Sequence, residues 1–153
     1  MARFFRRGVS EVFFAASVAV LDAPTSAEIT AAVDLSEAIA DIGGFMLTNS
    51  PIETPNLKTT FDAQIDGVDK TADSTFTLYD DDTDDAIRTA LAKGSVGFVI
   101  LCPYGNTVGK RAEVWPVKSV GFNDQWNLNA EAGKSVAGFA VTDLPEQAGV
   151  ITA

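Results

Sequence analysis

Hydrophobic and polar residues alternate with a period of two along most of the chain. The clearest case is Thr75–Tyr79, whose apolar residues face one way while its threonines face the other. A nearly continuous apolar run at Val96–Cys102 is typical of a strand buried on both faces. Further strands are expected at 10–14, 110–122 (where Pro116 predicts a bulge or a sheet edge) and 135–142. The pattern predicts a mainly β (α+β) fold, a β-sandwich or barrel.

Two segments show helical signals instead. Thr25-Ser26-Ala27-Glu28 is a capping box, which predicts a short turn of helix. One main helix is predicted at about 82–93, where an apolar stripe ends at Gly94. Leu35–Ile42 is ambiguous, because its apolar spacing fits a helix while the residues that follow it look extended. The length and hydrophobic content predict a single globular domain over 1–153 with a real core.

The segment from Asn49 to Asp73 is polar and contains Pro51, Pro55 and Gly67. We expect an extended hairpin here rather than a structureless loop. A long excursion from a compact domain is usually functional or covered by a partner.

The N-terminus carries three arginines before an apolar run at Val12–Leu21, which superficially resembles a secretory signal. The run is too short to span a bilayer, and Asp22 and Pro24 spoil a cleavage site. We therefore expect an N-terminal arm, residues 1–8, followed by a strand.

The composition argues against most enzymes. The chain contains no histidine, so Ser-His-Asp triads, Cys-His pairs and histidine metal sites are excluded. Its one cysteine, Cys102, permits no internal disulfide and is expected to be a buried, inert thiol. A net charge of −10 disfavours binding to nucleic acid or anionic lipid. No catalytic residue, metal or cofactor is assigned.

Asp80–Asp85 is the most conspicuous polar cluster. An EF-hand calcium loop would need glycine at Asp85 and glutamate at Leu91, so the sequence departs from that pattern. Acidic residues are favoured at a helix N-terminus, and this interpretation is preferred. Weak Ca²⁺ binding is left as an alternative.

Other candidate sites have plain alternatives. Trp115 and Trp126 could line a sugar-binding face, although Trp115 lies mid-strand, where a core or interface role is the default. Gly105–Lys110 precedes a strand and lacks P-loop spacing, so a phosphate site is rejected. The arginines of the arm are expected to pair with carboxylates of a neighbouring subunit.

Taken in order, several stretches resemble the major tail protein, or tail tube protein, of long-tailed, non-contractile bacteriophages. The matching segments are Ile39–Phe45, Pro51–Ile52, Thr54–Leu57, Asp73–Asp81, Ile87–Leu91 with Lys93–Gly94, Glu113–Lys118 and Phe139–Glu146. No single motif is specific, since the resemblance lies in the succession of elements. It favours an extended strand for the ambiguous Leu35–Ile42 segment.

The resemblance implies a β-sandwich that closes into an inner barrel on oligomerisation, in hexameric rings stacked into a hollow tube through which DNA passes without specific binding. It also implies a virion protein assembled in the host bacterial cytoplasm, with a tape-measure protein, a tail terminator and distal tail proteins as partners and no membrane. Contacts between rings are expected from the arm, from 49–73 and from a C-terminal tail, 147–153. The candidate contact residues are Arg3, Phe4, Phe5, Arg6, Arg7, Pro51, Ile52, Pro55, Leu57, Phe61, Val150 and Ile151.

Charge agrees with such a role. A tube wall of the same sign as DNA would let phosphates slide without adhering. Salt screens charges over about 8 Å, so only carboxylates that face the lumen would have this effect. Which acidic residues face inward is not evident from the sequence. The alternatives are a carbohydrate-binding or adhesin β-sandwich, the inner tube of a contractile tail or injection machine and, more distantly, a hydrolase with two carboxylates.

Overall fold

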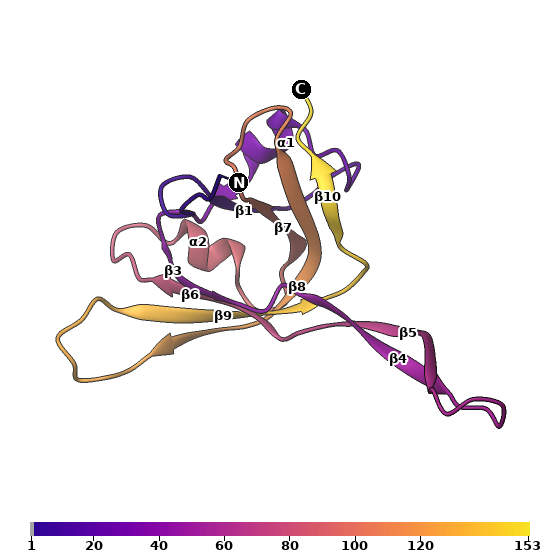
Figure 1. Ribbon diagram of the computed structural model, residues 1–153. Helices are drawn as coiled ribbons and strands as arrows, with labels where there is room; N and C mark the ends of the chain where they lie inside the picture. Colours follow the sequence, from indigo (N-terminus) through magenta and orange to yellow (C-terminus); the bar gives the residue numbers. More distant parts are fainter. Residues whose placement is uncertain (1) are drawn as a thin grey trace.

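The computed structural model describes residues 2–153 and is built mostly from antiparallel strands (Figure 1). Eight strands form one sheet in the order β2-β1-β7-β8-β9-β6-β3, with β10 pairing β8, and β4 and β5 form a separate two-stranded hairpin. The strands are β1 (Glu11–Ala15), β2 (Val33–Asp34), β3 (Ile39–Gly43), β4 (Leu47–Thr54), β5 (Ala63–Thr71), β6 (Ser74–Tyr79), β7 (Val96–Cys102), β8 (Arg111–Gln125), β9 (Lys134–Val141) and β10 (Glu146–Val150). The mainly β prediction is confirmed.

Strand β8 belongs to two layers of the fold. Its first part, up to Lys118, pairs with β7, and its first residues also pair with β10. From Val117 onward it pairs with β9, and it curves between the two layers in Figure 1. The sheet therefore folds over on itself into a sandwich-like arrangement that is not closed.

Pro116 lies in the middle of β8, opposite Phe98 of β7, so it is at neither a bulge nor an outer edge of the sheet. The bulge falls nearby, between Ser119 and Gly121. The carbonyl of Pro116 accepts the N–H of Thr142, and in an antiparallel strand a residue's N–H points to the same side as its C=O. Its missing donor thus faces Thr142, just beyond the end of β9, and not β7.

The main core lies between the layers. Trp115 is fully buried and meets Phe45 edge to face, with ring centroids 5.6 Å apart and planes at 86°. Phe76 stacks on Phe45 at 5.0 Å and meets Phe139 edge on at 5.3 Å. Within the described residues the indole Nε1–H of Trp115 has no hydrogen-bond acceptor. Such aromatic clusters dominate core energetics.

A second core lies under the helix α1 (Ser26–Ala31), whose Ile29 is fully buried. The predicted capping box is present, because the side chain of Thr25 accepts from the N–H of Glu28 and the carboxylate of Glu28 accepts from the N–H of Thr25. These contacts lower the pKa of Glu28 below its ordinary value, chiefly through the Thr25 backbone N–H. The short first helix is therefore confirmed.

The predicted main helix at about 82–93 is wrong in extent. Helix α2 spans only Ala86–Ala90 and is one residue shorter than α1. The aspartates before it form local turns instead, because Asp81 accepts from the N–H of Thr83 and Asp84 accepts from the N–H of Ala86. Short acidic side chains compete with helical backbone bonds in this way. The acidic run therefore precedes the helix rather than forming its first turn.

The extended interpretation of the ambiguous Leu35–Ile42 segment is confirmed only from Ile39 onward, where β3 begins, because residues 36–38 form a turn. The extended hairpin expected over 49–73 is confirmed, since this segment forms most of the β4–β5 hairpin. The hairpin projects from one end of the molecule (Figure 1). No helix among residues 2–153 has the length and hydropathy needed to cross a membrane.

Candidate assembly surfaces

One face of the four-stranded region β3-β6-β9-β8 is turned away from the core, and we call it the open sheet face. The register aligns on it Asp41, Gly43, Thr75, Thr77, Tyr79, Lys118, Gly121, Asn123, Gln125, Lys134, Val136, Gly138 and Ala140. Most of these side chains are small or neutral. The charged ones are one aspartate and two lysines, and the Lys134 ammonium lies 5.8 Å from the Tyr79 ring centroid. The acidic charge of the chain therefore lies elsewhere.

The same four strands have two open edges. Among the described strands, β3 pairs only with β6, and residues 120–125 of β8 pair only with β9. The free edges are five and six residues long. On β3 the carboxylate of Asp41 accepts from the N–H of Ile42 at 2.9 Å, so a charged side chain protects one outward donor. Unpaired edges of this kind are templates for pairing with another chain.

The β4–β5 hairpin carries an exposed apolar stripe on one face. Ile52 and Ile65 are cross-strand partners, and Val68 lies on the same face. Their side chains are 53%, 56% and 66% exposed. Glu53 lies on the opposite face. We call Ile52, Ile65 and Val68 the hairpin stripe.

A β-bulge makes this stripe. Between the Ser50–Val68 and Ile52–Ile65 pairs, β5 advances three residues while β4 advances two. Without that extra residue, positions 65 and 68 would face opposite sides, since side chains alternate along a strand. Gly67 lies in the bulge, and a Cβ there would be 1.8 Å from the carbonyl oxygen of Ser50. Glycine is therefore required by close backbone approach.

The turn between β8 and β9 exposes two large apolar side chains that the sequence analysis did not place at an interface. Trp126 is 90% exposed and Leu128 is 105% exposed. The turn is ordered by polar contacts, in which Asn127 donates to the Glu131 carboxylate and accepts from the N–H of Asn129. We call Trp126 and Leu128 the β8–β9 tip. The signal in the sequence was an isolated Trp-Asn-Leu between strands, which periodicity alone does not interpret.

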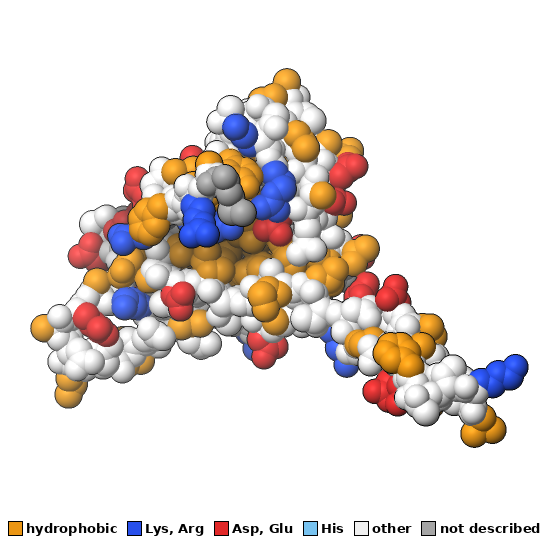
Figure 2. Space-filling model, viewed as in Figure 1, with side chains coloured by type: hydrophobic (Ala, Val, Ile, Leu, Met, Phe, Trp, Pro, Cys, Tyr) orange, Lys and Arg blue, Asp and Glu red, His pale blue; other side chains and the backbone are white. Residues whose placement is uncertain are grey.

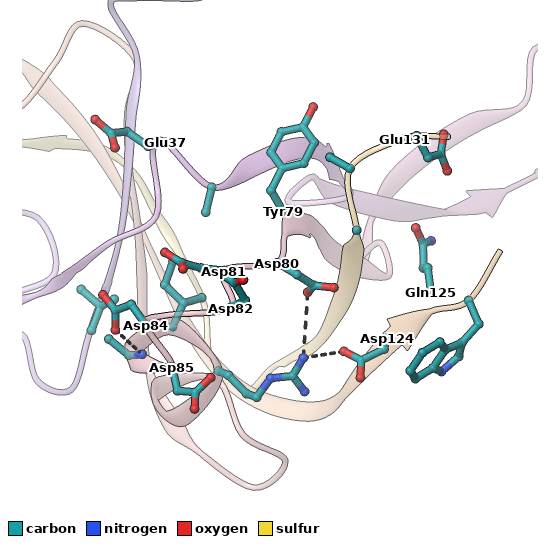
Figure 3. Close-up of a pocket in the computed structure, with 18 of the residues that line it drawn as sticks. Glu37, Tyr79, Asp80, Asp81, Asp82, Asp84, Asp85, Asp124, Gln125 and Glu131 are labelled. Carbon is teal, nitrogen blue, oxygen red and sulfur yellow. Dashed lines mark hydrogen bonds and ion pairs between the residues drawn. The ribbon is translucent and has the colours of Figure 1, made fainter. Parts of the chain in front are cut away.

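An acidic groove of about 1020 Å³ lies beside this tip (Figure 3). Its carboxylates are Asp34, Glu37, Asp80, Asp81, Asp82, Asp84, Asp85, Asp124 and Glu131. Arg88 of α2 points into the groove, where it donates to Asp124 and forms a longer ion pair with Asp80 at 3.9 Å. The Ser135 hydroxyl lies within hydrogen-bond distance of both carboxylates and donates its single proton to one or the other. The hydrogen bonds from Arg88 and then Ser135 lower the pKa of Asp124.

The aspartates of the acidic run, Asp80–Asp85, have different hydrogen-bond partners in the structure. The Asp81 pKa is lowered by the hydrogen bonds of the Thr83 N–H and hydroxyl, while Asp80 lies against Arg88 and Ser135. Within residues 2–153 no group of three or more cysteine, aspartate or glutamate side chains has a geometry that could hold a metal ion. Local hydrogen bonds thus account for much of this cluster.

The N-terminal arm lies against its own chain, apart from Met1, which is outside the described residues. The Phe4 ring is 5.1 Å from that of Tyr104, in the turn after β7, and the Arg6 guanidinium lies 5.4 Å from the Phe4 ring centroid. Phe5 projects into solvent. Basic side chains gather around this part of the surface (Figure 2). Nearby, burial raises the pKa of Glu113, an effect partly offset by Arg111 and Arg6.

The C-terminal segment is folded into the domain. Val150 is partly exposed at the end of β10, but Ile151 is 1% exposed and belongs to the second core. Thr152 forms a parallel bridge with Thr25 beside α1. Ile151 is therefore packed within its own subunit and offers almost no exposed surface to a neighbouring one.

Two further sequence-based candidates are buried. Trp115 has no exposed surface, so it cannot stack on a sugar, and its core interpretation is confirmed. Cys102 is also buried, and burial raises its pKa to about 12. A thiol with this pKa is protonated near neutrality and unreactive.

Comparison with known proteins adds the family. A search of the curated proteins finds no match. Among solved structures, a chain from a structure titled "Cryo-EM structure of the anti-feeding prophage (AFP) baseplate, 6-fold symmetrised" superposes with a TM-score of 0.62 at 10% identity, over 98% of this chain and 99% of that one. At this identity the likeness concerns the fold. The family model described as "Phage tail tube protein" matches residues 1–153. The chain therefore belongs to the phage tail tube protein family, structural components of the virion.

Proposed function

We propose that six copies of the chain form a ring in which β3 of one copy pairs with the free edge of β8 in the next, and that such rings stack into a hollow tail tube for phage DNA. The single observation that supports this most is the pair of open edges on one continuous sheet region, five and six residues long. A head-to-tail contact whose rotation closes produces a ring, and translated rings extend into a tube.

Strand direction supports the same closure. Each neighbour in β3-β6-β9-β8 is antiparallel, so β3 and β8 run in opposite directions. Joining β8 of one copy to β3 of the next continues an all-antiparallel barrel without a parallel junction. Closing the sheet in this way removes the exposed edges that would otherwise aggregate. Six-fold symmetry is described for the assembly that contains the similar fold.

The open sheet face would line the bore. Its residues carry only Asp41, Lys118 and Lys134 as charges, so the expected anionic wall has no support on this face. Short neutral side chains such as Thr75 and Thr77 offer DNA few contacts, and screening weakens charges beyond about 8 Å. Low adhesion would thus come from small neutral groups rather than from repulsion.

The proposal also includes assembly in the host cytoplasm and three kinds of partner: a tape-measure protein in the bore, a tail terminator and distal tail proteins. The tail would be of the long, non-contractile type. A tube of that type should not recruit a sheath protein. Binding of a co-expressed sheath to the purified tubes would instead favour the inner tube of a contractile tail or injection machine.

Electron microscopy of the purified chain tests ring formation. Ile42→Pro removes an N–H that points away from β6, so it should leave the monomer folded but prevent rings and tubes. Ile42→Val is the matched control and should assemble normally. Rings of unchanged diameter in the proline variant would contradict closure through this edge.

Cysteine labelling tests which face lines the bore. In tubes of Thr77→Cys, a small maleimide should label the new thiol while a protein-sized maleimide should not, although both label the monomer. The native Cys102 is buried and provides a silent background. Equal labelling of tubes by the large reagent would place this face on the outside.

A further inference from the structure

Two apolar surfaces lie at opposite ends of the molecule. The hairpin stripe is on the β4–β5 hairpin, and the β8–β9 tip ends the other long hairpin, which points the opposite way in Figure 1. Hydrophobic side chains are exposed at both far ends in the space-filling view (Figure 2). Neither surface has a cover within the described residues.

Both surfaces need a partner for physical reasons. A two-stranded hairpin is at best marginally stable in water unless its apolar face packs on something. Exposed tryptophan side chains are uncommon on free surfaces and frequent at the centres of interfaces. A chain that assembles head to tail presents complementary surfaces at its two ends.

We propose that the β8–β9 tip of one copy packs against the hairpin stripe of a copy in the adjacent ring. This proposal rests on the proposed function and names the partner surface for the projecting hairpin. Trp126 and Leu128 supply the large side chains, and the stripe supplies the flat apolar strip that receives them.

Charge makes the two surfaces complementary. Among the cross-strand pairs on the stripe face, Lys70 is the charged side chain, whereas Glu53 and Asp69 lie on the opposite face. Beside the tip, the acidic groove contributes Glu131 and eight other carboxylates. A stripe flanked by lysine therefore meets a tip flanked by carboxylates, while the reverse face of the hairpin would be repelled.

Disulfide cross-linking tests the contact directly. In tubes of the double variant Ile65→Cys/Leu128→Cys, oxidation should link each copy to the next ring and give a ladder on non-reducing gels that continues past six subunits. A contact inside a ring would close on itself, so a ladder that stops at six overturns the proposal. Cys102 does not interfere, because it is buried and its pKa is raised to about 12.

Ile65→Cys/Val108→Cys is the matched control, because Val108 is also exposed but lies in the turn before β8. It should give no ladder in the same tubes. Tubes of the Ile65→Cys/Leu128→Cys variant that yield no cross-link overturn the inference and leave the proposed function standing. A wild-type chain that never forms rings or tubes overturns both.

Truncating the tip gives an independent readout. Trp126→Ala should raise the protein concentration required for tube growth roughly tenfold or more, as truncation of an interface tryptophan does. Its circular dichroism spectrum and thermal midpoint should match those of the wild type, because the side chain is exposed. Unchanged tube growth in this variant contradicts the role of the tip.

Discussion

Replacing Gly67 by alanine should raise the protein concentration required for tube assembly while leaving the domain folded. The added Cβ would lie 1.8 Å from the carbonyl oxygen of Ser50 and 2.9 Å from its carbon, both backbone atoms that cannot rotate away. The bulge must open, and Ile65 then turns away from the face that carries Val68. Because β4 and β5 lie outside the core, the free energy of unfolding should change little.

The size of the effect follows from the stripe. Fully burying a side chain of this size is worth about 1.5–3 kcal/mol. Ile52, Ile65 and Val68 are 53%, 56% and 66% exposed. Burying the exposed surface of all three side chains in one contact between rings would stabilise that contact by roughly 3–5 kcal/mol. Losing half of this, about 1.5–2.5 kcal/mol, would raise the concentration required for tube growth roughly 10- to 70-fold.

Light scattering of purified protein over a concentration series, with electron microscopy of the products, measures that threshold. Gln64→Ala is the matched control, because Gln64 is next to Ile65 in the same strand but on the opposite face. It should assemble like the wild type. If Gly67→Ala forms tubes at the wild-type threshold, the stripe does not carry assembly and the reasoning fails.

Further outcomes follow from individual contacts. Thr25→Ala removes the capping box and should lower stability by about 1 kcal/mol, measured by urea denaturation. Trp115→Ala should cost about 3–5 kcal/mol or unfold the domain, visible by circular dichroism, because the ring fills the core. Cys102 should stay unreactive to a thiol reagent at pH 8 until denaturant is added, since burial keeps it protonated. The lowered pKa of Asp124 adds stability that is present above its unfolded value and lost as pH falls through the folded value; Arg88→Gln should move its NMR titration midpoint upward.

Much of the fold could be predicted from local pattern. Strand β6 was evident because Phe76 and Leu78 alternate with threonines, and α1 because a capping box is a short-range signal. Helix α2 was overextended, since the apolar spacing through Leu91 is helical while the Asp81 and Asp84 side chains form turns that delay its start. The spacing of apolar residues does not show that aspartate side chains compete with main-chain carbonyls for the backbone N–H groups.

The candidate surfaces were predicted only in part. Ile52 belongs to an exposed stripe as expected of a contact residue, but its role stays a prediction. Ile151 could not be distinguished from an exposed tail residue, because its burial depends on β10 returning to β8 across the sequence. Trp126 was weighed as a sugar platform, since one sequence does not reveal that its turn projects away from the body.

The bulge at Gly67 limits how this hairpin can change in length. One added or deleted residue between Ile65 and Val68 would reverse the side that Ile65 presents, whereas two would restore it. The connection at 55–62 lies outside the paired strands, so a change in its length does not alter which side Ile65 faces. An epitope tag or a divergent lineage could therefore lengthen the outer end by any number of residues, but near the bulge only by even steps.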